Sequence, residues 1–285
     1  MDMRTLGRAG IEVSPVGFGC WAIGGPFSNP AGEPLGWGVV DDEESVRAIR
    51  RAVELGVTFF DTADAYDLGL NEELLADALH PYDGLFIATK CGHVRPSRGE
   101  WVPLGRPEYL RQQAELSLRR LRVERLDLLQ LHRLDPQVPL ADQVGALARL
   151  REEGKVARIG LSEVSVAQLT EARAVAPIAS VQNRYNLTDR ASDDVLGYCE
   201  REGIAFVPWL PIARGDHAKV GGVLGKVAAG LGATPAQVSL AWLLRRSPVV
   251  IPIPGTSSIR HLEENCGAAG ITISDDDFAR LGELG

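Results

Sequence analysis

The stretch Val57–Tyr66, with the sequence VTFFDTADAY, decides how the rest of the chain is interpreted. β-Branched and aromatic residues open this stretch, and they predict a short buried strand that is entered through a turn at Gly56. The strand stops at Asp61, and Tyr66 follows five residues later in a polar loop. Burial of a carboxylate at a strand end is costly unless a cation pairs with it. The sequence therefore predicts a cationic partner for Asp61.

Two further apolar runs also stop at polar residues. The run Phe86–Lys90, FIATK, ends at an amine, and the run Leu128–His132, LLQLH, ends at an imidazole. If these runs form neighbouring parallel strands, their carboxyl ends meet at one edge of a sheet, and Lys90 supplies the cation that Asp61 needs. Three strands that each end at a group able to move or steady a proton predict an active site at this edge.

Short apolar runs alternate with amphipathic segments along the whole chain, which is typical of a parallel β/α protein. We expect a hairpin over residues 3–14 and a helix from the cap at Asp41-Asp42 to about residue 55. The other expected helices cover 71–79, 107–121, 140–153, 166–174, 192–202 and 235–246, with two more starting near 258 and 275. The expected strands cover 16–19, 57–61, 86–90, 128–131, 156–161, 179–182, 205–208 and 249–251.

Eight strands favour a closed barrel over an open doubly wound sheet. A chain of 285 residues has the length typical of such barrels. No GxGxxG motif opens a helix, and the nearest approach, Gly17-Phe18-Gly19, continues with CWAI. We therefore predict an α/β fold in which residues 1–285 form a single (β/α)8 TIM barrel domain with an N-terminal β-hairpin.

Charge and composition exclude several classes of function. The formal net charge of −8 argues against a nucleic-acid partner or an anionic membrane surface. No apolar segment reaches the roughly 18 residues of a spanning helix, and the N-terminus lacks the layout of a signal peptide. The four cysteines lie far apart and form no CxxC pair. We expect reduced thiols in a cytoplasmic protein without a metal site.

The barrel would bring Asp61, Tyr66, Lys90 and His132 to one cavity at the C-terminal ends of its strands. Tyrosine, with an ordinary pKa of about 10, is a poor acid near neutral pH. A buried ammonium beside the phenol stabilises the phenolate, and lowering its pKa by about 2–3 units takes roughly 3–4 kcal/mol. Asp61 would keep Lys90 charged, and His132 could hydrogen-bond a substrate oxygen. We expect a proton donor for a carbonyl oxygen, matched to a hydride arriving at the carbonyl carbon.

These motifs resemble the catalytic tetrad of the aldo-keto reductase superfamily. The resemblance is carried by Asp61-Thr62-Ala63 with Tyr66, by Ala88-Thr89-Lys90, and by the Leu129-x-Leu131-His132 ending, and it extends over essentially the whole chain. It implies a barrel that reduces aldehydes and ketones reversibly with a nicotinamide cofactor, usually NADPH, and without metal. By this resemblance Tyr66 is the general acid, Lys90 and Asp61 tune it, and His132 orients the carbonyl.

The resemblance also implies a set of cofactor contacts. Ser162 and Gln182 match residues that hold the nicotinamide carboxamide, and Trp209 takes the place of an aromatic that stacks on its ring. Glu163 departs from the family's Asn, because an ionised carboxylate donates no hydrogen bond. The full set of expected cofactor-binding residues is Trp21, Ser162, Gln182, Trp209, Leu210, Pro211, Ile212, Gly255, Thr256, Ser257, Arg260, Glu264 and Asn265.

The segment from Ile253 to Asn265 is similar to the family's adenosine-phosphate segment, where the start of a helix suits a phosphate. Many family members carry a Lys in this loop that contacts the 2′-phosphate. Gly255 stands there in this chain, which leaves Arg260 and His261 as the nearby cations. NADPH remains the expected cofactor, with NADH or dual use as an open alternative.

The substrate pocket is expected to be lined by Trp21 and Trp101, with Trp37 a weaker candidate, and to take a small-molecule carbonyl or alcohol. Each of these residues has a plain structural explanation when it is taken singly, such as packing at the barrel rim. Their joint spacing favours the enzyme. One alternative is a sensing or regulatory subunit that binds the cofactor with little turnover. A barrel aldolase or isomerase with Lys90 as a Schiff base is disfavoured, because Asp61 would keep that amine charged.

Overall fold

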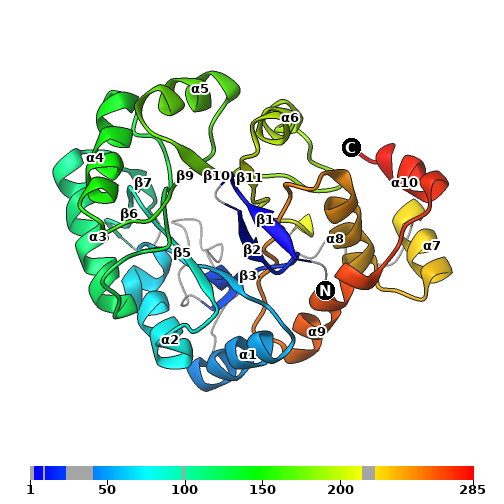
Figure 1. Cartoon of the computed structure of the whole chain (residues 1–285). Coiled ribbons are helices and arrows are strands. Elements are labelled where there is room, and N and C mark those ends of the chain that lie inside the picture. Colours follow the sequence, from blue (N-terminus) through cyan, green and yellow to red (C-terminus); the bar gives the residue numbers. More distant parts are fainter. Residues whose placement is uncertain (1–2, 9, 24–40, 98–99, 214–221) are drawn as a thin grey trace.

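The computed structural model describes residues 3–8, 10–23, 41–97, 100–213 and 222–285. Their main feature is one curled sheet of parallel strands surrounded by helices (Figure 1). The strands, in spatial order, are β3 (Phe18–Gly19), β4 (Phe59–Asp61), β5 (Phe86–Cys91), β8 (Leu128–Leu131), β9 (Ile159–Ser162), β10 (Ile178–Gln182) and β11 (Ala205–Phe206). This order follows the sequence, as a (β/α)8 barrel requires.

The expected eighth strand is present as an extended segment with broken pairing. Val250 forms a parallel bridge with Phe206 of β11, while the backbone N–H groups of Gly17 and Gly19 donate to Pro252 and Pro254 carbonyls at 2.9 and 3.3 Å. Pro252 and Pro254 have no N–H to return those bonds, so a regular ladder to β3 cannot form. The segment nevertheless lies between β11 and β3 and closes the barrel.

The helices lie outside the sheet, and several begin at caps that the sequence encodes (Figure 1). Asp41 accepts a hydrogen bond from the Glu44 backbone at 2.8 Å, and Ser165 and Thr234 each form a capping box. The α-helices are α1 (Asp42–Glu54), α2 (Leu70–Leu79), α3 (Pro107–Leu121), α4 (Leu140–Glu152), α5 (Val166–Val175), α6 (Asp193–Glu202), α7 (Gly222–Leu231), α8 (Pro235–Arg246), α9 (Ile259–Gly267) and α10 (Asp275–Gly282). Short 3₁₀ turns cover η1 (Cys20–Ile23), η2 (Tyr66–Gly69) and η4 (Ala268–Gly270).

The predicted hairpin forms from β1 (Arg4–Leu6) and β2 (Ile11–Val13), and it crosses the middle of the barrel in the view of Figure 1. Leu6 and Val13 are fully buried in one apolar cluster with barrel-facing side chains such as Phe59. A Cβ on Gly7 would lie 2.9 Å from the Ala179 carbonyl oxygen. The hairpin therefore closes the end of the barrel where the strands begin, which leaves the opposite end for a site.

Two elements were not predicted. The loop expected after Lys90 contains a hairpin of β6 (His93–Val94) and β7 (Val102–Pro103). Helix α7, with the sequence GVLGKVAAGL, lies in the stretch before Pro235 that the sequence predicts as loop. It is helical because Leu224, Val227 and Ala228, spaced three and four residues apart, share one buried face. Trp37 lies outside the described residues.

Among the described residues, no single helix is both long and apolar enough to span a membrane. The consecutive helices α7 and α8 reach that length and composition only together, with a bend of 90° between them. The four cysteines, Cys20, Cys91, Cys199 and Cys266, are buried free thiols.

Two Gly→Ala substitutions should have opposite effects on stability. A Cβ on Gly160 of β9 would lie 2.3 Å from Ser180 Oγ and 2.9 Å from Gln130 Cγ, so Gly160→Ala should lower the free energy of unfolding by about 1–3 kcal/mol. On α4, a Cβ on Gly145 meets only the end of Arg149, at 3.9 Å. Gly145→Ala should raise stability by about 0.5–1 kcal/mol, because alanine favours a helix. Urea unfolding of the two variants measures both effects, and equal stabilities would contradict the prediction.

Candidate active site

Strand alternation aims the polar residues into the barrel. On β4, β5 and β8 the side chains of Phe59, Ala88 and Leu128 belong to the inner apolar cluster. Side chains two residues further along a strand face the same side, so Asp61 and Lys90 point inward above that cluster. Pairing of β5 with both β4 and β8 brings these positions together at the C-terminal ends of the strands.

Lys90 is the centre of the site. Its fully buried Nζ donates to Asp61 Oδ2 at 2.5 Å, to the Thr62 carbonyl oxygen at 2.9 Å and to the Tyr66 hydroxyl at 3.1 Å. An ammonium has three N–H groups, so all of them are used. Burial opposes the charged form, but the Asp61 carboxylate and the Tyr66 phenol outweigh it, and the pKa of Lys90 is raised. The predicted cation for Asp61 is therefore in place.

Asp61 is satisfied by three donors. Besides Lys90, its Oδ1 accepts hydrogen bonds from Gln130 Nε2 and Gln182 Nε2, both at 2.9 Å. Gln182 was expected to contact the cofactor, and in this structure it holds Asp61. Gln130 was not predicted, although a polar residue within the apolar run LLQL was a signal. Such complete hydrogen bonding is what a carboxylate requires when its residue is 1% exposed.

The expected net lowering of the Tyr66 pKa is wrong. Burial raises the pKa of the phenol above its ordinary value, and the Lys90 ammonium offsets only part of that effect. Loss of hydration penalises the phenolate more than one neighbouring cation favours it, since Asp61 cancels much of the field of that cation. Tyr66 is therefore a protonated phenol at neutral pH.

His132 lies beside Tyr66, with the two rings edge to face and 5.8 Å apart. The rings of His93 and Trp101 complete an aromatic cluster around it, at 4.9 and 6.0 Å. Burial and then the Lys90 charge hold the pKa of His132 well below its ordinary value, and burial lowers the pKa of His93 to about 3. Both imidazoles are therefore neutral, and the Nδ1 atoms of both are buried without a partner in the described part of the chain.

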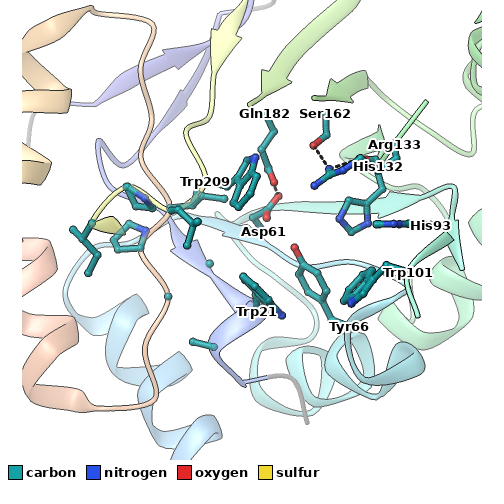
Figure 2. A pocket seen from close by; sticks show the side chains of 18 residues that line it. Trp21, Asp61, Tyr66, His93, Trp101, His132, Arg133, Ser162, Gln182 and Trp209 are labelled. Carbon is teal, nitrogen blue, oxygen red and sulfur yellow. Dashed lines mark hydrogen bonds between the residues drawn. The ribbon is translucent and has the colours of Figure 1, made fainter. Parts of the chain in front are cut away.

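A cavity of about 250 Å³ opens above these groups (Figure 2). Many predicted residues line it: Trp21, Asp61, Tyr66, Trp101, His132, Ser162, Gln182, Trp209, Leu210, Pro211, Ile212 and Gly255. Lys90 lies behind Asp61 and Tyr66 and does not reach the cavity wall. Six further lining residues were not among the predicted site residues, although Ile253 and Pro254 belong to the segment likened to the family's adenosine-phosphate segment: Gly19, Ala22, His93, Arg133, Ile253 and Pro254.

Glu163 has a defined role in this wall. Its backbone is in the left-handed region, at φ 56°, and its Oε1 accepts hydrogen bonds from Trp209 Nε1 at 2.6 Å and from the Arg184 backbone at 2.7 Å. A charge-assisted bond of this length fixes the direction of the indole. The carboxylate thus holds Trp209 in place. The sequence analysis considered only the donor that Glu163 lacks and did not predict this contact.

Arg133 directly follows His132 and projects into the cavity beside Ser162 (Figure 2). Its Nη1 donates to the His132 carbonyl oxygen at 2.6 Å and to Ser162 Oγ at 3.0 Å. Within the described ranges, no carboxylate lies within ion-pair distance of this guanidinium. The only signal in the sequence was its position next to a predicted catalytic residue.

The remaining expected cofactor residues, Thr256, Ser257, Arg260, Glu264 and Asn265, lie beyond the cavity wall, in the loop before α9 and on that helix. Ser258 caps α9, and the exposed Arg260 pairs with Glu264 at 3.2 Å. A Cβ on Gly255 would lie 2.6 Å from the Gly19 carbonyl oxygen and 3.0 Å from Ala22 Cβ. That contact explains why a residue as large as Lys is not found at position 255.

Comparison with known proteins agrees with this geometry. The model of the aldo/keto reductase family matches residues 15–285. An uncharacterized oxidoreductase of Schizosaccharomyces pombe is 49% identical over 245 residues, which cover 86% of this chain and 80% of that protein. The pyridoxine 4-dehydrogenase of Escherichia coli is 37% identical over 290 residues, which cover 99% of this chain and 98% of that protein.

Solved structures share the same fold. A thermostable aldo-keto reductase in complex with the inhibitor epalrestat has a TM-score of 0.85 at 31% identity, and the match covers 100% of both chains. An aldo-keto reductase from Klebsiella pneumoniae in complex with NADPH has a TM-score of 0.81 at 26% identity, with 100% of this chain and 95% of that chain covered. The chain belongs to the aldo/keto reductase family of NAD(P)H-dependent oxidoreductases.

Proposed function

We propose that this protein reduces aldehydes or ketones with NADPH, reversibly, and that Tyr66 is the proton donor. The observation that carries the proposal is the position of Lys90 Nζ, which bonds both Asp61 and the Tyr66 hydroxyl directly below the cavity. A phenol held in this way has a fixed direction, and its proton is available to an oxygen bound in the cavity.

The residues present fit a nicotinamide cofactor. Ser162 and Gln182 place a hydroxyl and an amide at the cavity wall, the Trp209 indole offers a flat face, and Gly255 lines the cavity without a side chain. We assign the wall residues Trp21, Leu210, Pro211 and Ile212 to the same site. Thr256, Ser257, Arg260, Glu264 and Asn265 would hold the phosphate end, where α9 begins. When it is bound, NADPH supplies the hydride.

The chain's own residues then handle the proton. Tyr66 donates its hydroxyl proton to the carbonyl oxygen as negative charge develops there, and Lys90 stabilises the resulting phenolate through its 3.1 Å bond. Asp61 keeps the ammonium in place. The neutral His132 ring can hydrogen-bond the same substrate oxygen, because it lies edge to face with Tyr66. The aromatic wall excludes water from the reacting atoms.

Tyr66→Phe removes the proton donor and leaves the ring. We expect kcat for aldehyde reduction to fall by about 10²–10⁴-fold, the usual contribution of a general acid, while the affinity for NADPH stays within about threefold. Stopped-flow absorbance of NADPH measures the rate, and quenching of tryptophan fluorescence measures binding. The carbonyl panel should include pyridoxal, because the E. coli relative is named a pyridoxine 4-dehydrogenase.

Unchanged turnover by Tyr66→Phe would contradict the role of Tyr66. Tight NADPH binding by the wild-type protein with no turnover of any carbonyl or alcohol would instead support the alternative, a cofactor-binding sensing or regulatory subunit.

The pKa shifts predict a flat pH profile around neutrality. Reduction needs Tyr66 protonated, and the pKa of Tyr66 lies above its ordinary value of about 10. Reduction also needs a neutral His132 throughout this range, and the pKa of His132 lies well below its ordinary value of about 6.5. Neither group titrates between about pH 6.5 and 8, so kcat with saturating NADPH should change by less than about twofold there. A sigmoidal loss centred near pH 7 would contradict this prediction.

Arg260 should select NADPH over NADH. Arg260→Ala removes an exposed guanidinium near the expected phosphate site, so we expect the Kd of NADPH to rise about tenfold and the Kd of NADH to stay constant. Arg280→Ala is a matched control, because Arg280 is also exposed on a helix and pairs with an acid in the next turn, Asp277 at 2.9 Å. Fluorescence titration gives all four constants. An equal loss of affinity for NADPH and NADH, or no loss for either, would show that Arg260 does not contact the 2′-phosphate.

A further inference from the structure

The charges around the cavity do not balance. Lys90 and Asp61 neutralise each other through a 2.5 Å ion pair. Tyr66 is protonated, and His93 and His132 are neutral because burial depresses the pKa of each imidazole. Among the described residues whose polar groups line the cavity, Arg133 alone is left with a net charge.

Glu163 is the nearest candidate to neutralise Arg133, but its carboxylate is engaged elsewhere. Its Oε1 accepts both the Trp209 indole N–H and the Arg184 backbone N–H. The guanidinium of Arg133 lies 5.9 Å from the centre of the Trp209 ring, and it forms no direct ion pair with Glu163 in the described structure. Glu163 acts on Arg133 only as a more distant charge that favours its protonated form.

Arg133 also keeps hydrogen-bonding capacity. Its Nη1 bonds two neutral oxygens, from His132 and Ser162, and these two bonds use two of the five N–H groups of a guanidinium. The remaining donors belong to a half-buried cation, which burial penalises by lowering its pKa. A planar fork of donors with an uncompensated positive charge fits a carboxylate in a bidentate pair.

We propose that Arg133 makes this pocket selective for carbonyl compounds that carry a carboxylate close to the reacting carbonyl group. The charge of Arg133 acts on the Tyr66 phenol, and Arg133, His132 and Tyr66 line one cavity of about 250 Å³. A single small substrate can therefore place its reacting carbonyl at Tyr66 and its carboxylate at Arg133. This inference rests on the proposed carbonyl reduction. Hydride from NADPH forms the new C–H bond, the Tyr66 proton forms the O–H bond, NADP⁺ leaves, and the carboxylate is unchanged.

The test compares acids with their methyl esters, which differ little in shape and by one charge. The probe pairs are phenylglyoxylate with methyl phenylglyoxylate, and 4-formylbenzoate with methyl 4-formylbenzoate. For each pair the measured quantity is the ratio of kcat/KM for the acid to that for the ester, with saturating NADPH. The wild-type protein should favour 4-formylbenzoate over its ester, a result that needs no variant.

Three variants separate the local charge from general effects. Arg133→Gln keeps hydrogen-bond donors and removes the charge, so the acid-to-ester ratio should fall at least tenfold, mainly through a higher KM for the acid. Arg133→Lys keeps the charge and should retain most of the ratio. Arg111→Gln changes the net charge equally, at an exposed pair with Glu153 on the outer surface, and should leave the ratio unchanged.

The outcomes are distinct. A wild-type preference for methyl 4-formylbenzoate over 4-formylbenzoate, or the same ratios in Arg133→Gln as in the wild-type protein, would overturn the assignment of Arg133. A fall in the ratio for Arg111→Gln as large as that for Arg133→Gln would overturn it as well, because the effect would then be one of overall charge. Absence of turnover with both acids and esters would instead refute the proposed carbonyl reduction.

Discussion

One buried ammonium constrains the whole upper end of the barrel. Lys90 is inaccessible to solvent, and it is tolerated because three oxygen atoms, from Asp61, Thr62 and Tyr66, take its three N–H groups. Those oxygens come from the end of one strand and the loop after it. A one-residue shift in register between β4 and β5 would turn Asp61 or Lys90 to the other face of the sheet and separate the two charges. The chemistry and the strand pairing therefore depend on each other.

The layer of side chains next to the Lys90–Asp61 pair also depends on the strand register. Gln130, Gly160 and Ser180 follow one another across β8, β9 and β10 in matching register, and Gln130 passes the hydrogen-bond network from Ser180 to Asp61. Gly160 has no side chain because those two neighbours fill the space. A polar layer is acceptable in a barrel core only when the hydrogen-bonding groups of its members have partners. In this layer Gln130 supplies one of the two donors to Asp61 Oδ1.

The convergence of Asp61, Lys90 and His132 could be predicted from the sequence because each of them ends an apolar strand, and period-two alternation then fixes the direction of each side chain. Gln130 obeyed the same alternation but was hidden inside an apolar run. His93 lies in the short β6–β7 hairpin and Arg133 in a loop, both just after strand ends, and no periodicity specifies the paths of these connections. The eighth strand was placed correctly, yet Pro252 and Pro254 break its ladder. The pKa of Tyr66 required burial, which only the folded structure supplies.

Glu163, Trp209 and Arg133, at the rim of the cavity, bear on the selectivity that we propose for carboxylate substrates. Substituting Glu for the expected amide at position 163 removes a donor from the wall, but the carboxylate then fixes the Trp209 indole and the Arg184 backbone. Because both bonds engage the same oxygen atom and turn the acid toward Trp209, the acid forms no ion pair with Arg133 in the described structure and acts on it only from a distance. The carboxylate of Glu163 thus positions the Trp209 indole, and the guanidinium of Arg133 stays directed into the cavity. In the selectivity that we propose, the fold leaves one charge, that of Arg133, unpaired at the cavity, while Lys90 below it holds the Tyr66 hydroxyl in place.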